Sequence, residues 1–204
     1  MKRFCIFSGG EIYDYSVVSI HENDIVMCAD SGLYHANKIG IIPDIVAGDF
    51  DSYFDDISFK CTVIRCKPEK DDTDTMMCVK YALSHEADEI VIYGGLSGRL
   101  DHTFANIQTL RYCVERNVMA VIDDGLNKSL VQTVGRAEYQ QNKGYFSVFA
   151  LTDKLMIKEL SGVKYPLKDY SMTSDFPIGV SNEIIENAVL EISEGYALII
   201  FSKK

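Results

Sequence analysis

Short apolar runs alternate with helix-like segments through the first part of this chain, and no other feature limits its possible folds as strongly. Nearly continuous apolar runs are typical of parallel strands that helices cover on both faces. The runs cover residues 3–8, 24–29, 44–47, 62–66, 89–93 and 118–123, and the helix-like segments cover 31–39, 72–84 and about 100–116. The alternation predicts an α/β fold whose N-terminal domain, residues 1–124, is a doubly wound, mostly parallel sheet.

The pattern changes after Asp123-Asp124-Gly125. From there on, short strand candidates follow one another with turn signals between them and no long helical pattern. The candidates cover residues 129–134, 145–151, 155–159, 163–167, 183–192 and 197–201, and the turn signals include Ser161-Gly162. Residues 125–204 are therefore predicted to form a small C-terminal all-β sandwich or barrel, with the domain boundary near 124–127.

Charge and cysteine usage exclude several classes of protein. A formal net charge of -10 disfavours general binding to nucleic acid and to an anionic membrane surface. It permits an anionic nucleotide as substrate, because a divalent cation can bridge carboxylates to phosphates. The six cysteines form no C-x-x-C pair and mostly lie in apolar runs, so we expect reduced thiols rather than zinc ligands. With no signal peptide or membrane-spanning run predicted, we expect a cytoplasmic protein.

Two polar clusters directly follow apolar runs. In the first, Ser31 and Gly32 open a helix-like segment whose free N–H groups could approach a phosphate, although Asp30 or Ser31 could simply cap that helix. In the second, Asp49 and Asp51 are two residues apart, so both carboxylates of an extended segment point to one side. Such a pair suits a magnesium ion, and its alternative is a solvated acidic turn.

A third cluster, Lys70-Asp71-Asp72-Thr73-Asp74, opens another helix-like segment. Asp72 or Thr73 is a natural cap there, and acidic residues suit a helix N-terminus. Three acids exceed what a cap requires. The surplus acid is a candidate third metal ligand.

The fourth cluster follows the run at 89–93 and reads Gly94-Gly95-Leu96-Ser97-Gly98-Arg99-Leu100-Asp101-His102. Its glycines permit close approach of the backbone to a polyphosphate, and Arg99 could bind phosphate oxygens. His102 could act as an acid or base, or only as a hydrogen-bonding group at a helix start. Acids for a metal, a glycine turn and an arginine at strand ends together point to phosphoryl transfer, without naming the acceptor.

The motifs PDIVAGDFDS, KDDTD and GGLSGRLDHTFANIQTL, followed by GVKYPL and GVSNE, resemble in their order the thiamine pyrophosphokinase family. The resemblance spans the chain from about Asp30 to Asn182. It implies an N-terminal α/β domain, a C-terminal β-sandwich for thiamine binding and dimerisation, and a homodimer with active sites between subunits. The implied reaction transfers pyrophosphate from ATP to the thiamine hydroxyl, giving AMP and thiamine diphosphate.

The resemblance also implies residue roles. Asp49, Asp51 and Asp74 would hold Mg²⁺, with Asp71 nearby as a supporting group or a base. The residues implied at the ATP site are Ser31, Gly32, Arg99, Asp101 and His102. Those implied at the thiamine site are Tyr165, Ser181 and Asn182. Tyr165 stands where some relatives carry tryptophan; its alternative is a core aromatic, and that of Ser181-Asn182 is an ordinary turn.

Other functions use the same residues. A metal-dependent phosphohydrolase or another nucleotide kinase would need the same acids, with water or a different alcohol as the attacking group. A nucleotide or thiamine sensor would bind without turnover, although the acid, arginine and glycine positions are all filled. A purely structural protein would leave clustered carboxylates without a cation, which is unfavourable.

Overall fold

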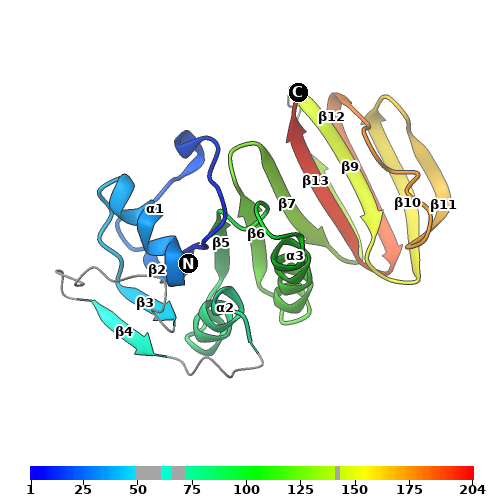
Figure 1. Cartoon of the computed structure of the whole chain (residues 1–204). Coiled ribbons are helices and arrows are strands. Elements are labelled where there is room, and N and C mark those ends of the chain that lie inside the picture. The colour runs from blue at the N-terminus through cyan, green and yellow to red at the C-terminus, as the bar shows by residue number, and fades with distance from the viewer. Residues whose placement is uncertain (49–60, 66–71, 141–142) are drawn as a thin grey trace. The chain divides into compact units, whose positions relative to one another are not determined.

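The computed structural model describes residues 1–48, 61–65, 72–140 and 143–204, and the chain divides into two compact units, Met1–Leu126 and Asn127–Lys204. Figure 1 shows the strands and helices of each unit. Among the helices of the described residues, none has both the length and the apolar character that a membrane span needs.

The first unit is built on parallel strands that match the predicted apolar runs to within one residue at either end. They are β1 (Arg3–Phe7), β2 (Ile25–Ala29), β3 (Ile45–Gly48), β4 (Thr62–Arg65), β5 (Glu89–Tyr93) and β6 (Met119–Asp123). Their order is β4-β3-β2-β1-β5-β6, and each neighbouring pair is parallel. The chain builds outward from β1 on one side and then returns to build on the other, so the strand order reverses between β1 and β5.

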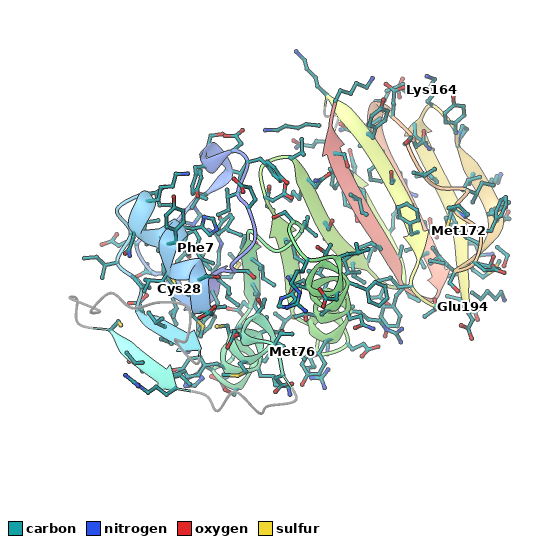
Figure 2. All side chains as sticks on the ribbon, in the orientation of Figure 1. Phe7, Cys28, Met76, Lys164, Met172 and Glu194 are labelled. Carbon is teal, nitrogen blue, oxygen red and sulfur yellow. The ribbon has the colours of Figure 1, made fainter. Side chains whose placement is uncertain are left out.

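Three helices of the described residues connect these strands: α1 (Leu33–Lys38), α2 (Asp74–Ser84) and α3 (Leu100–Val114). Right-handed crossovers place the connections on opposite faces when the direction of strand addition reverses. This rule puts α1 on one face and α2 with α3 on the other, and α2 does pack against α3. On the α1 side, Leu33 and Ala36 join Cys5, Phe7 and Cys28 in one buried cluster. Figure 2 labels Phe7 and Cys28.

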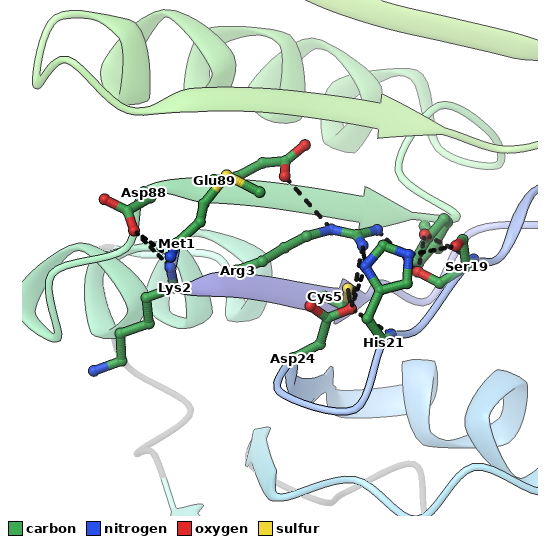
Figure 3. Close-up of polar contacts among 10 residues, drawn as sticks. Met1, Lys2, Arg3, Cys5, Ser19, His21, Asp24, Asp88 and Glu89 are labelled. Atoms are coloured by element: carbon green, nitrogen blue, oxygen red, sulfur yellow. Dashed lines mark hydrogen bonds and ion pairs between the residues drawn. The ribbon is translucent and has the colours of Figure 1, made fainter.

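A buried arginine ties the central strands together at their amino ends. Arg3 of β1 is 8% exposed and forms ion pairs with Asp24, before β2, at 3.2 Å and with Glu89 of β5 at 3.7 Å. Its guanidinium also donates to Nδ1 of His21 at 2.8 Å and to the Ser19 carbonyl at 2.9 Å (Figure 3). A buried charge with this many partners is expensive to leave unpaired, so the contacts fix how β1, β2 and β5 align.

The second unit consists of antiparallel strands. They are β7 (Asn127–Gln132), β8 (Gly135–Tyr139), β9 (Gly144–Ala150), β10 (Lys154–Val163), β11 (Leu167–Thr173), β12 (Ile184–Glu194) and β13 (Ala197–Lys203). β13 pairs with β7 and β9, and the remaining strands form a sheet of order β11-β10-β12-β8. Side chains of both groups share one core, which includes Phe146 and Ile199 from the first group and Ile157, Met172 and Leu190 from the second. The predicted combination of a mostly parallel α/β sheet and a separate antiparallel sheet is confirmed.

The prediction of a turn at Ser161-Gly162 is wrong. Both residues lie inside β10, which ends at Val163. The strand predicted at 163–167 is also wrong, because it overlaps β10 only at Val163 and β11 only at Leu167. The pairing with β12 shifts between Ser161 and Val163, and Gly162 has a φ of +72°. A Cβ on Gly162 would lie 2.1 Å from the Asn187 carbonyl oxygen, so the glycine permits a bulge in a continuous strand rather than a reversal.

Candidate active site

A cleft of about 240 Å³ lies in the first unit, at the carboxyl ends of β1, β2 and β5. This edge of the sheet, where the strand order reverses, is where ligands of open α/β folds bind. The turn after β1 contributes Ser8, Gly9 and Gly10, and the turn after β5 contributes Gly94 and residues 97–99. The rest of the lining comes from residues 29–31 after β2, 73–75 at the start of α2, and His102 and Asn106 of α3.

The two glycine turns interlock. The N–H of Gly10 donates to the Gly94 carbonyl at 2.9 Å, and a Cβ on Gly10 would lie 2.4 Å from that same oxygen. Gly94 has a φ of +73°, and its own Cβ would lie 2.5 Å from the Gly10 carbonyl oxygen. Neither position accepts a side chain without movement of backbone. The result is a backbone wall that a polyphosphate can approach closely.

Buried polar side chains hold the two glycine turns in place through hydrogen bonds. The buried hydroxyls of Ser8 and Thr75 are 2.8 Å apart, which joins the end of β1 to the start of α2. The buried amide of Asn106 donates to the Gly95 carbonyl at 2.9 Å, which joins α3 to the turn after β5. Ser8, Gly9, Gly10, Thr75 and Asn106 were not among the residues predicted for the site. The sequence signal that could have found them is the glycine pair directly after a buried strand, repeated at Gly9-Gly10 and Gly94-Gly95.

Carboxylates enter the cleft from two elements. Asp74, in the first turn of α2, lines it, as does Asp30, which has a φ of +47°. Carboxylate oxygens are the donors that Mg²⁺ prefers, so this donor chemistry fits the predicted ion. Within the part of the chain that the structure describes, no three His, Cys, Asp or Glu side chains gather closely enough to hold a metal. Asp49, Asp51 and Asp71 lie outside the described residues.

Both capping alternatives can be compared with the structure. The cap of α2 is Thr73, whose side chain accepts from the N–H of Met76 at 3.1 Å. Asp72 instead pairs with Lys80 at 2.7 Å, so it serves neither as cap nor in the cleft. The N-cap position of α1 is Gly32, because residues 30–32 form a 3₁₀ turn, η2 (Asp30–Gly32). The alternative that Asp30 or Ser31 occupies that cap position is therefore wrong.

The residues predicted at the ATP site are partly brought together. Ser31, Arg99 and His102 line the cleft. Gly32 does not: it is buried behind the lining, where a Cβ would lie 2.0 Å from the Phe7 carbonyl oxygen. Asp101 does not line the cleft either, and its carboxylate holds Arg99 through two contacts, of 2.6 and 3.2 Å. The hydrogen bond from Arg99 lowers the pKa of Asp101, but both side chains are exposed and this surface pair is easily exchanged for a phosphate.

The residues predicted at the thiamine site lie together in the second unit. The side-chain amide of Asn182, 6% exposed, accepts from the N–H of Tyr165 at 3.0 Å and donates to the Tyr165 carbonyl at 2.9 Å. Ser181 has a φ of +58°, and its N–H donates to the Ser147 hydroxyl at 3.0 Å. The Tyr165 side chain is 60% exposed, so the alternative of a core aromatic is wrong. Asn182 thus presents Tyr165 at the surface, where it is available to stack on a ligand.

Fold and cleft together define a class of protein: an α/β protein with a cleft between paired glycine turns, suited to a phosphorylated ligand, and with a separate β unit. Comparison with the sequences of known protein families identifies the family within this class. The sequence model for "Thiamin pyrophosphokinase, catalytic domain" matches residues 18–122, and that for "Thiamin pyrophosphokinase, vitamin B1 binding domain" matches residues 133–197. The chain therefore belongs to the thiamin pyrophosphokinase family, and it is an enzyme of the kinase class.

Similarity to individual thiamine pyrophosphokinases supports the same family. The chain is 30% identical over 193 residues to a thiamine pyrophosphokinase of Bacillus subtilis (strain 168), covering 89% of this chain and 88% of that protein. It is 28% identical over 157 residues to thiamin pyrophosphokinase 1 of Caenorhabditis elegans, covering 72% of this chain and 65% of that protein. The crystal structure of a thiamine pyrophosphokinase from Bacillus subtilis superposes with a TM-score of 0.88 at 26% identity, covering 100% of both chains.

Proposed function

We propose that the enzyme transfers pyrophosphate from ATP to the hydroxyl of thiamine, releasing AMP and thiamine diphosphate, with Mg²⁺ as its cofactor. The observation that carries the proposal is the cleft at the strand-order reversal, where two interlocked glycine turns face Asp74 and Arg99. Phosphoryl transfer depends on positioning and on neutralising charge, and these groups supply both.

The glycine turns and Ser31 would hold the polyphosphate of ATP. Arg99 would exchange its exposed contact with Asp101 for phosphate oxygens, because a guanidinium forks onto either group with similar geometry. His102, in the first turn of α3, also lines the cleft and would contact the nucleotide.

Asp49, Asp51 and Asp74 would hold the cation, which when bound neutralises charge on the transferred phosphates. Of these three, Asp74 lies in the described cleft. The thiamine oxygen attacks the β-phosphorus, the bond from that phosphorus to the bridging oxygen of AMP breaks, and AMP leaves with that oxygen. The proton of the hydroxyl passes to a base, for which Asp71 is the proposed group.

Tyr165, Ser181 and Asn182 would bind thiamine. Support comes from the exposed Tyr165 ring and from the two hydrogen bonds that fix its backbone to Asn182. An aromatic face attracts a cationic ring, and thiamine carries one. Replacing Tyr165 with Ala should therefore weaken thiamine saturation while leaving ATP saturation unchanged. Unchanged thiamine saturation would remove Tyr165 from the site.

The test of the reaction is one assay with purified protein, ATP, Mg²⁺ and thiamine, in which AMP and thiamine diphosphate are followed by chromatography. Equal amounts of both products, lost without thiamine and lost with EDTA, support the proposal. ADP or phosphate released without thiamine would indicate a phosphohydrolase or another nucleotide kinase. Bound ATP or thiamine without any product would indicate a sensor.

We also propose a homodimer whose active sites lie between subunits, each combining the first unit of one subunit with the second unit of its partner. Co-expression of Asp74→Asn and Tyr165→Ala chains tests this arrangement. Half of the dimers would be mixed, and each mixed dimer would regain one intact site, so activity at low thiamine should return to about a quarter of wild type. No recovery would mean that each site forms within one chain.

A further inference from the structure

Both backbone polar groups of Gly10 are held by hydrogen bonds. Its N–H donates to the Gly94 carbonyl at 2.9 Å, and its carbonyl faces Nε2 of His35 at 2.8 Å. His35 belongs to α1, is 7% exposed and does not line the cleft. The contact with His35 therefore turns the Gly10 carbonyl away from the space where phosphates would lie.

The geometry around His35 selects one tautomer. A carbonyl oxygen can only accept, so Nε2 must carry the proton that it donates to Gly10. The other ring nitrogen, Nδ1, lies 2.6 Å from the Tyr15 hydroxyl and must accept from it when the ring is neutral. Burial lowers the pKa of His35, with a further lowering by Lys38, against the opposing effects of the Gly10 hydrogen bond and of Glu11.

Tyr15 is itself fixed. It begins a short 3₁₀ turn, η1 (Tyr15–Val17), whose cap Asp14 accepts from the N–H of Ser16 at 3.0 Å. The ammonium group of Lys38 lies 4.4 Å from the centre of the Tyr15 ring. The hydroxyl of Tyr15 is thus aimed at His35 by contacts that do not involve the cleft.

We infer that His35 is a positioning residue: with Tyr15, it fixes the orientation of the Gly10 carbonyl and so keeps the cleft shaped for a nucleoside polyphosphate. The inference rests on the proposed function of the cleft. Glycine has no side chain that would restrict rotation of its peptide, so Gly10 depends on hydrogen bonds for a single orientation. A Gly10 carbonyl released from His35 could turn toward the cleft, where its oxygen would repel phosphate oxygens.

The test separates this role from simple stability by measuring binding of a fluorescent, non-hydrolysable ATP analogue. His35→Phe removes the donor but keeps a ring of similar shape, and His35→Gln places an amide N–H near the position of Nε2. We expect about tenfold weaker binding for the Phe variant, the effect of losing one buried hydrogen bond, and recovery to within about threefold of wild type for the Gln variant. Thiamine saturation should not change in either variant.

Val26→Ala serves as the matched control. Val26 is buried in β2 near the opposite end of the strand, so its truncation lowers stability without touching the cleft. An unchanged affinity of the folded His35→Phe variant, or an equal loss in Val26→Ala, would overturn the inference. A wild-type protein that does not bind the analogue would instead refute the proposed function of the cleft.

A second measurement does not require any variant to fold. The ¹⁵N shifts of the His35 ring in the wild-type protein report which nitrogen carries the proton. The inference requires the proton on Nε2 at neutral pH, because only a protonated Nε2 can donate to the Gly10 carbonyl. A proton on Nδ1 in the wild type would overturn it.

Discussion

Gly94→Ala is the sharpest available test of the interlocked glycine turns. Gly94 has a φ of +73°, which an alanine adopts at a cost of about 1–2 kcal/mol. The new Cβ would also lie 2.5 Å from the Gly10 carbonyl oxygen and 3.0 Å from that of Ser8. Both atoms belong to backbone, so the two turns must move apart, and the hydrogen bond from Gly10 to Gly94 would be weakened or lost.

That hydrogen bond adds about 1 kcal/mol to the cost, so the free energy of unfolding should fall by about 2–3 kcal/mol. For a chain of this length, such a loss lowers the melting temperature by roughly 4–12 °C. Because Gly10 and Gly94 both line the cleft, affinity for an ATP analogue should fall as well.

Gly40→Ala provides the control. Gly40 has nearly the same φ, +71°, but nothing lies within 4 Å of the position of its Cβ, and it does not line the cleft. It should pay only the conformational cost, about 1–2 kcal/mol, with unchanged affinity for the analogue. Calorimetry and a binding titration of both variants decide the question. Equal losses of stability in the two, together with unchanged binding by Gly94→Ala, would refute the interlocked geometry.

Three further predictions follow from other parts of the molecule. Asp74→Asn keeps the shape of the side chain but removes its charge, so turnover should fall by at least about tenfold and half-saturation should need more Mg²⁺; a Mg²⁺ titration with an unchanged midpoint would contradict this role. Burial lowers the pKa of His35 below its usual 6.5, so as the pH falls below 6.5 the unfolded chain binds a proton before the folded one. The free energy of unfolding should therefore decrease as the pH is lowered, by up to about 1.4 kcal/mol per pH unit from this group. Melting curves between pH 7.5 and 5 should show a shallower decline in His35→Gln, and parallel curves would argue against a buried neutral ring. Burial also raises the pKa of Cys5 and of Cys113 to about 12, so iodoacetamide should modify the partly exposed Cys61 well before either, as peptide mapping by mass spectrometry would reveal; rapid labelling of Cys5 in the folded protein would contradict its burial.

The two units differ in how well their sequences predicted them, and the reason is burial. Apart from the exposed edge strand β4, the strands of the parallel sheet are buried, so runs such as that of β5 are apolar without interruption and end where the strand ends. In the second unit, β8 carries Arg136 and Glu138, and β11 carries Lys168 and Asp169, all of them exposed. β11 lacks the clear alternation by which a half-buried strand is found, and the alternation in β8 rests on Ala137 and Tyr139 alone. Neither strand was predicted.

Local sequence pattern also predicted only part of the candidate active site. Gly94, Arg99 and His102 were predicted because they lie within one stretch of nine residues after a strand. Gly9 and Gly10 were seen only as a turn, because their importance depends on β1 lying beside β5. That pairing joins segments more than eighty residues apart and cannot be read from local pattern. His35 escaped for the same reason, since its partner Gly10 is 25 residues away in sequence.

One strand pairing connects the amino end of the sheet to the cleft at the other. Arg3 and Glu89 are direct partners in the pairing of β1 with β5, and they also form an ion pair there. Directly after this pairing, the N–H of Ser8 donates to the Tyr93 carbonyl at 2.8 Å, and the N–H of Gly10 donates to the Gly94 carbonyl, where the regular register ends. A slip of one residue would turn every side chain of the strand to the wrong face and would break the ion pair and the interlocked turns together. The contacts of buried Arg3 thus help to fix a register on which the distant cleft depends, although Arg3 does not line that cleft.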